Sequence, residues 1–196
     1  MKNKFILRLK PNPEQAIRLR QLQANFANLC NALMPFVLQN RCWSRVGLHH
    51  LAYRSLRESY PEMGSQMVCN AIYMVSRVCK KTYAAPDSPW RSKDNPDKTL
   101  PRIHFGPTAP VFFDRNTLSL KGKLLSMFTA DGRIRLEVQL AADLEYRLNA
   151  EKIKEIGLIT TKEQFFLTFV FGSDEEVLTD HPAYVSVELP VRNAAL

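Results

Sequence analysis

The sequence has few of the features that mark common enzyme classes. It contains no P-loop and no Gly-x-Ser-x-Gly, Gly-x-Gly-x-x-Gly or His-Glu-x-x-His pattern, which argues against a helicase, a protease or a metabolic enzyme. The four cysteines are separated by 12, 27 and 10 positions, at Cys30, Cys42, Cys69 and Cys79. These spacings fit neither a zinc site nor a dense disulfide framework. We therefore expect reduced, mostly buried thiols, no metal and no cofactor.

Long apolar runs are also lacking. No stretch of 18 apolar residues occurs, and the first residues, MKNKFILRLKP, place charges inside a short apolar run without a small-residue cleavage site. These features favour a cytoplasmic protein with no membrane partner. With 196 residues and 45% apolar content, the chain is large enough to bury a core.

Positive charge is abundant and unevenly distributed. Residues 1–110 hold 17 Lys and Arg against 6 Asp and Glu, whereas residues 111–196 hold 10 against 13. The net charge of +8 therefore comes from the first part of the chain. A protein this basic attracts polyanions, and nucleic acid is the commonest of these in the cytosol. A basic but otherwise inert surface is the alternative explanation.

The first 40 residues predict a strand followed by a long helix. Residues 5–10, FILRLK, alternate apolar and charged side chains as a half-buried strand does. Asn12 can then cap a helix that starts at Pro13, with Gln15 completing a capping box. Apolar residues at spacings of three and four extend this helix to about Gln39, with a bend or break near Pro35.

Two further helices are predicted downstream. One starts after Ser44 and ends before Pro61, and the other follows Gly64 and reaches Tyr83. Residues 86–110 contain six of the twelve prolines, and we predict no regular element there.

From residue 111 the pattern changes to short alternating runs with turn residues between them. Six strands are predicted within 111–172, and the Asp131-Gly132 pair is a typical hairpin turn. Together with the first strand they predict an α+β fold with a small antiparallel β-barrel and a three-helix insertion. The expected domains are a barrel (1–10 and 101–172), the helical insertion (11–85), a proline-rich linker (86–100), an acidic linker (173–183) and a closing strand (184–196).

Five stretches carry a resemblance to a known family. They are FILRLKPNPEQ at 5–15, LCNALM at 29–34 with its Asn31, PRIHF at 101–105, DGRIRLEV at 131–138 and VELPVRNAA at 187–195. In this order they resemble the front part of the TnpB family, the RNA-guided nucleases from which type V CRISPR effectors are thought to descend. PRIHF resembles the family's Pro-Arg-Phe-Lys, and the last stretch resembles Val-Asp-Leu-Gly-Ile-Arg-Asn-Leu-Ala, the first strand of the RuvC nuclease. The resemblance covers essentially the whole chain.

The resemblance implies a protein that holds nucleic acid and does not cut it. In this family the helical insertion and the wedge-like barrel bind guide RNA, its DNA hybrid and a short DNA motif, while a downstream RuvC domain cleaves. Cleavage requires three acids that hold two Mg²⁺ ions. Only the first has a counterpart here, Glu188 in place of Asp, followed by Pro190 in place of Gly. A carboxylate that is one methylene longer is misplaced by about 1 Å, more than a catalytic site tolerates, so we expect Glu188 to be vestigial.

The leading hypothesis is a non-cleaving, RNA-guided or RNA-dependent DNA-binding protein, with structured guide-like RNA and double-stranded DNA as partners. Basic side chains would neutralise phosphates and Tyr83 would stack on a base. The candidate residues are Lys10, Arg18, Arg20, Arg41, Arg45, Arg77, Lys80, Lys81, Tyr83, Lys121, Lys123 and Arg133.

Two other hypotheses stay open at this point. The chain could be one half of a split nuclease completed by a separate RuvC-bearing polypeptide, because a lone last strand offers unpaired backbone groups to a partner or to a second copy. It could also be a truncated transposon remnant, although its caps, turns and apolar stripes remain mutually consistent.

Overall fold

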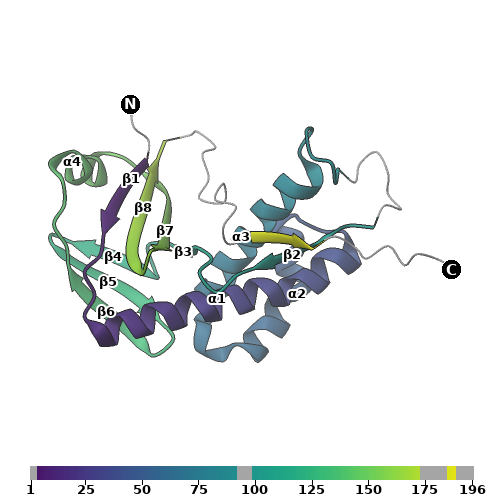
Figure 1. The fold of residues 1–196 in the computed structure, drawn as a ribbon, viewed down its shortest axis with the longest axis horizontal. Helices are drawn as coiled ribbons and strands as arrows, with labels where there is room; N and C mark the ends of the chain where they lie inside the picture. The colour runs from purple at the N-terminus through teal and green to yellow at the C-terminus, as the bar shows by residue number, and fades with distance from the viewer. Residues whose placement is uncertain (1–3, 92–98, 173–184, 189–196) are drawn as a thin grey trace.

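The computed structural model describes residues 4–91, 99–172 and 185–188. Its helices and antiparallel sheets give an α+β fold (Figure 1). One end of the molecule contains strand β1 (Lys4–Arg8), the strands between residues 111 and 171, and the short helix α4 (Ala142–Ala150). The other end contains α2 (Arg45–Ser59) and α3 (Gly64–Ala84). The long helix α1 (Pro13–Asn40) extends from the first end to the second.

The start of α1 follows from its sequence. The Asn12 side chain accepts a hydrogen bond from the Gln15 backbone N–H (2.8 Å), and the Gln15 side chain accepts one from the Asn12 backbone N–H (3.0 Å). The predicted capping box is therefore confirmed. The helix continues through Pro35 to Asn40 and ends where Arg41 adopts a left-handed conformation (φ 45°). Ser44 caps α2 as predicted, and the 3₁₀ turn Pro61–Met63 leads into α3.

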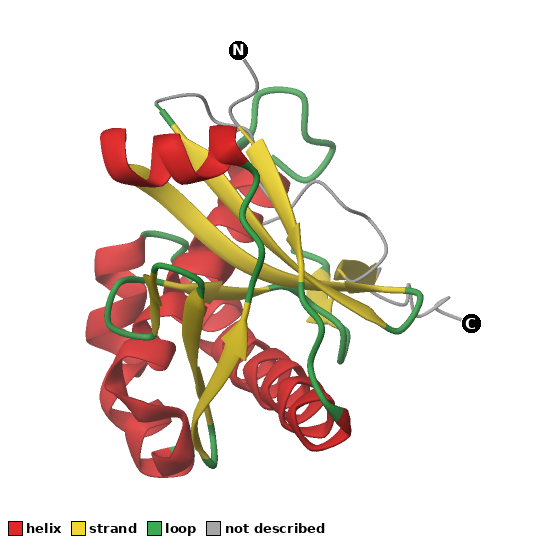
Figure 2. Cartoon of the chain, turned by 90° about the vertical axis from the view of Figure 1, so that its left-hand side faces the viewer, coloured by secondary structure: helices red, strands yellow, loops and turns green. Residues whose placement is uncertain are grey.

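The strands form three sheets, and no closed barrel is found among the described residues, contrary to the prediction from sequence. The four-stranded sheet has the order β1, β8 (Gln164–Phe171), β7 (Ile153–Thr161) and β3 (Val111–Phe113). The three-stranded sheet contains β4 (Leu118–Lys121), β5 (Leu124–Thr129) and β6 (Gly132–Glu137). Figure 2 shows these sheets from the side, with α4 crossing the top of the molecule. Because β4–β6 pair only with one another in the described residues, the two sheets do not close.

The third sheet corrects two further predictions. Strand β2 (Arg102–Phe105) lies in the proline-rich stretch where no element was expected, and it pairs antiparallel with β9 (Val185–Glu188). The closing strand is therefore not alone, because one of its edges is occupied by β2. The predicted acidic linker (173–183) lies outside the described residues, as do residues 189–196.

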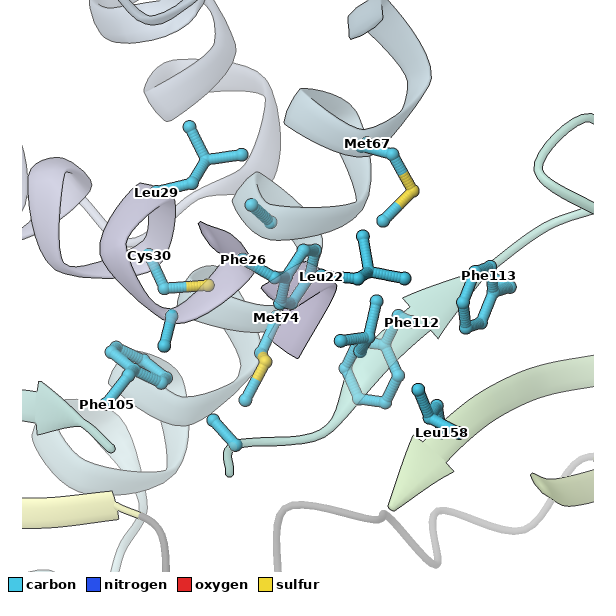
Figure 3. Packing of buried hydrophobic residues seen from close by; sticks show 14 of the residues in the cluster. Leu22, Phe26, Leu29, Cys30, Met67, Met74, Phe105, Phe112, Phe113 and Leu158 are labelled. Atoms are coloured by element: carbon cyan, nitrogen blue, oxygen red, sulfur yellow. The ribbon is translucent and has the colours of Figure 1, made fainter. Parts of the chain in front are cut away.

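One continuous core joins the helices to the sheets (Figure 3). Leu22 and Phe26 of α1 lie near Met74 of α3, Phe105 of β2 and Phe112 of β3. Buried amides add directed contacts: Asn70 donates to the Phe112 carbonyl (3.1 Å) and Gln23 accepts from the Thr160 hydroxyl (2.7 Å). Since these partners are far apart in sequence, they fix how the helices sit on the four-stranded sheet.

Asn31 holds β2 against α1. Its Oδ1 accepts from the Phe105 backbone N–H (2.8 Å), and its Nδ2 donates to the Phe105 carbonyl (2.9 Å). A side-chain amide thus replaces a neighbouring strand at this edge of β2.

We expect Asn31→Ala to lower the free energy of unfolding by about 1–3 kcal/mol, because both backbone groups of Phe105 lose their partner. Urea denaturation followed by circular dichroism measures the change. Asn28→Ala, at an exposed position of the same helix, is the matched control and should change stability by less than about 0.5 kcal/mol. Equal effects of the two substitutions would show that the amide does not anchor the strand.

Candidate nucleic-acid interface

The three-stranded sheet has one buried and one exposed face. Along β5 and β6 the side chains alternate, so that Leu125, Met127, Ile134 and Leu136 are buried while Arg133 and Arg135 are exposed. The register places Ser126 opposite both Ser119 and Arg135, and Phe128 opposite Arg133. Residues that oppose each other share a face, so the exposed face consists of Ser119, Lys121, Leu124, Ser126, Phe128, Arg133, Arg135 and Glu137. We call it the basic sheet face.

Arg133 is the best-ordered cation on this face. Its Nε donates to the Ser126 hydroxyl (2.8 Å), its Nη2 to the Ser126 carbonyl (2.9 Å) and its Nη1 to the Asn116 carbonyl (3.2 Å). The residue is nevertheless exposed. The guanidinium is therefore held in a defined position while it remains accessible to a ligand, which lowers the conformational entropy that binding would cost.

Two helices border the basic sheet face. The first turns of α1 cover the edge of β6, where the Gln15 amide donates to the Arg135 carbonyl (2.8 Å). At the other border, a Cβ placed on Gly64 would lie 3.7 Å from the ring of Phe128, so the start of α3 packs against this ring. These contacts close the β6 edge and cover part of Phe128, while Lys121, Arg133 and Arg135 stay exposed on the face.

The charges of this region are predominantly positive. Lys121, Arg133 and Arg135 lie on the face, and Lys123 lies in the turn between β4 and β5. The exposed acids of these strands and their turns are Glu137 at the end of β6 and Asp131 in the β5–β6 turn. An exposed sheet face with cations and hydroxyls can bind a phosphate backbone.

Arg135 did not figure among the sequence candidates. The alternation of β6, in which every second residue is apolar, places it on the same face as Arg133. The pattern of the sequence therefore contained the signal that would have found it.

Three of the predicted nucleic-acid-binding residues, Arg18, Arg77 and Tyr83, make contacts within the protein, and these contacts argue against a role in nucleic-acid binding. The Arg18 Nη2 donates to the Thr129 hydroxyl (2.7 Å) and to the carbonyls of Asp131 and Gly132 (2.9 and 3.0 Å), which ties α1 to the β5–β6 turn. Arg77 forms an ion pair with the buried Glu155 (2.6 Å).

Tyr83 is the third of these residues. It is fully buried, its hydroxyl donates to the Pro101 carbonyl (2.5 Å) and its ring lies against Trp43. Burial raises the pKa of the phenol. The ring is therefore part of the core and cannot stack on a base.

Two other candidates, Arg20 and Arg41, have structural roles that limit their availability for binding nucleic acid. Arg20 pairs with Glu163 (3.0 Å) in the β7–β8 turn and lies over the ring of Phe165, although its side chain stays half-exposed. Arg41 is half-buried at the end of α1, where its left-handed backbone closes the helix.

The remaining candidates are exposed but do not all lie together. Lys10 comes two residues before the α1 cap, close to the β6 edge that α1 covers. Lys80 and Lys81 lie in the last turns of α3, about 24 Å along the helix axis from Gly64, which touches the sheet. Arg45 lies at the start of α2, over the ring of Tyr73 (5.3 Å). The structure therefore brings Lys121, Lys123 and Arg133 together and separates Lys80 and Lys81 from them.

The described residues do not assemble a metal-dependent catalytic centre. No group of three or more His, Cys, Asp or Glu within residues 4–91, 99–172 and 185–188 could hold a metal ion. The register places Glu188 opposite Arg102, a cation, rather than opposite another acid. Within the described part of the chain, therefore, no cluster of acids suited to a two-metal nuclease site is assembled.

The four cysteines are free thiols. Cys30 and Cys79 are buried, and Cys42 and Cys69 are half-buried. Burial raises the pKa of Cys30, Cys69 and Cys79. A raised pKa disfavours the reactive thiolate, so these three thiols are poorly suited to act as nucleophiles.

A cavity of about 710 Å³ lies at the other side of the three-stranded sheet, beside α4. Its apolar lining includes Phe113, Ile156 and Phe169, and its charged residues are three acids and three bases: Asp114, Glu145, Glu155, Arg115, Lys152 and Lys154. Because the two signs balance, the cavity shows no preference for an anionic ligand.

In the part of the chain that the structure describes, no helix is long and apolar enough to cross a membrane. Comparison of the sequence with protein-family models and with curated proteins gave no match.

Proposed function

We propose that the chain is a nucleic-acid-binding protein whose basic sheet face holds a phosphate backbone. The observation that carries this proposal is the gathering of Lys121, Lys123, Arg133 and Arg135 on and beside one open sheet face. Among the described residues these four cations form no ion pair, so they repel one another, and a bound polyanion would relieve that repulsion.

The spacing of these cations suits a nucleic-acid strand. Arg133 and Arg135 are two residues apart on one strand, about 7 Å. Lys121 lies two strands away in the row of Glu137, about 12 Å from Arg135 and about 16 Å from Arg133. The phosphates of one nucleic-acid strand follow each other at about 3.4 Å along the helix axis. The three side chains can therefore reach phosphates about two to five nucleotides apart, and the serine hydroxyls between them can bond phosphate or ribose oxygens.

Structured RNA is the ligand that we favour, with DNA bound in an RNA-guided or RNA-dependent manner and not cut by this chain. The resemblance to the front part of the TnpB family supports this choice. In that proposal, residues 11–85 form the recognition unit and the strands of 1–10 and 101–172 form the wedge-like unit. The observed pairing of β9 with β2 occupies one edge of this strand and so weakens the argument from a lone strand for a split nuclease.

The dependence of binding on salt tests the proposal. If about four cations touch phosphate, the logarithm of the association constant should fall with the logarithm of salt concentration at a slope between about −3 and −4. Fluorescence anisotropy with a labelled RNA hairpin and with duplex DNA measures the slope. A slope near zero for both ligands, or no binding at low salt, would contradict the proposed function.

A further inference from the structure

A second recessed site lies between α2 and α3. It is a pocket of about 350 Å³ lined by Arg45, Val46, His49, His50, Cys69 and Ile72. Ile72 is buried and Cys69 half-buried, so α3 supplies an apolar floor, whereas the four residues from α2 are exposed at the rim. The volume is at the small end of the range for ligand pockets, about 300–1,000 Å³. Such a pocket suits one flat ring system better than a larger ligand.

The flat groups at the rim are held in place by tyrosines. The His49 ring stacks on Tyr53, with centroids 4.5 Å apart and an interplanar angle of 16°. The Arg45 guanidinium lies 5.3 Å from the ring centroid of Tyr73. Since both side chains are already ordered by these contacts, stacking of a ligand on them would cost little further side-chain entropy.

The chemistry of the pocket favours an anionic ligand with an apolar face. No acid is among its six lining residues, and residues 13–84 as a whole hold nine Lys and Arg against three Glu. Val46 is an apolar residue at the rim of the pocket, and it is 66% exposed, so its side chain is open to contact with a ligand. A nucleotide presents both a flat apolar base and a phosphate, and it is therefore complementary to this combination.

The pocket is close to the basic sheet face. Residues 114–117 form the turn between them: the Asn116 carbonyl accepts from Arg133 on the face, and burial chiefly raises the pKa of the Cys69 thiol of the pocket, with the nearby Asp114 adding to the shift. In addition, α3 starts against Phe128 of the sheet and reaches Cys69 five residues later. One nucleic-acid molecule could therefore contact both regions.

From this geometry we propose that the pocket between α2 and α3 binds an unpaired base next to the stem held by the basic sheet face, an inference that rests on the proposed function. The ligand class is a single-stranded nucleotide that adjoins a duplex. Arg45 contacts its phosphate, His49 and His50 contact its base, and Val46 is covered by the base.

The test uses an RNA hairpin with a single-stranded tail that contains 2-aminopurine, and the same hairpin without the tail. Binding of the full chain should quench the 2-aminopurine emission, because a stacked base fluoresces less. The double variant Arg45→Ala/His49→Ala should lose the quench and about tenfold or more of the affinity for the tailed hairpin, in the range expected for one stacked base. Its affinity for the hairpin without the tail should change by less than about threefold.

Arg54→Ala is the matched control, because it removes a cation from the same helix at a position that is exposed and outside the pocket. It should keep the quench. If the wild type binds both hairpins without a preference for the tail and without a quench, the pocket inference is wrong and the proposed function stands. The ligand of the pocket would then belong to another class, such as a protein side chain. If neither hairpin binds, the proposed function itself fails.

Discussion

Replacing Arg77 by methionine should lower the free energy of unfolding by about 3–5 kcal/mol. Arg77 of α3 pairs with Glu155 of β7 at 2.6 Å, and only 19% and 4% of the two side chains are exposed. The Tyr73 hydroxyl also donates to Glu155 (3.2 Å). Removal of the guanidinium takes the ion pair away from a buried carboxylate, and the cost of weakening the compensation of a buried charge exceeds the cost of the lost contact.

Urea denaturation followed by circular dichroism measures this change. The control is Arg54→Met, because Arg54 pairs with Glu58 at 3.2 Å on the surface, with 93% and 69% of the side chains exposed. Such a pair contributes at most about 1 kcal/mol. The double variant Arg77→Met/Glu155→Met should recover most of the lost stability, because it leaves no buried charge. A loss below about 1 kcal/mol for Arg77→Met would show that Arg77 is not a structural residue and would restore it as a candidate for phosphate binding.

Charge reversal on the basic sheet face should have the largest effect on binding. We expect Lys121→Glu/Arg133→Glu/Arg135→Glu to weaken the association with an RNA hairpin by about 1,000-fold or more. A hydrogen bond to a charged group contributes about 1.5–3 kcal/mol, and three such contacts are lost together. The replaced carboxylates also repel the phosphates.

All three substituted residues are exposed, so the variant should keep the wild-type circular dichroism spectrum, while loss of the Arg133 hydrogen bonds to Ser126 and Asn116 should lower its midpoint of unfolding only modestly. The control is Arg54→Glu/Lys152→Glu/Lys162→Glu, which changes the net charge equally at exposed positions outside the face. It should weaken binding by less than about tenfold through the long-range field alone. Equal losses in the two variants would mean that net charge, and not the sheet face, determines binding.

Local signals in the sequence were enough to predict most of the helices and strands. The Asn12 capping box, the Ser44 cap and the alternating runs after residue 111 act over a few residues, and each corresponds to an element of the structure. Helix α4 was not predicted because its start at Ala142 has no side-chain cap. It buries only Leu144 and Arg147, so its apolar stripe is also weak.

Contacts between distant residues could not be predicted in the same way. Arg18 bonds a turn more than 110 positions away, and Arg77 pairs with a residue 78 positions away. A basic residue next to apolar ones has the same local pattern whether it faces solvent or a buried acid. Tyr83 illustrates this point, because its place beside Lys80 and Lys81 suggested exposure while its ring completes the core against Trp43.

The barrel prediction failed for a related reason. Alternation indicates that a strand has one buried face, but it does not show which strands are neighbours. Strands β4–β6 form a separate sheet, and β2 was hidden by prolines on either side that leave its four residues unbroken.

The most direct test of the central claim is the location of the RNA contact by nuclear magnetic resonance. Amide chemical shifts of the full chain are followed as an RNA hairpin is added at low salt. If RNA binds the basic sheet face, the largest shifts are expected at Lys121, Ser126, Arg133 and Arg135, and the amides of α4 should not shift. Shifts that concentrate on α4, or that leave β4–β6 unchanged while RNA binds, would contradict the claim.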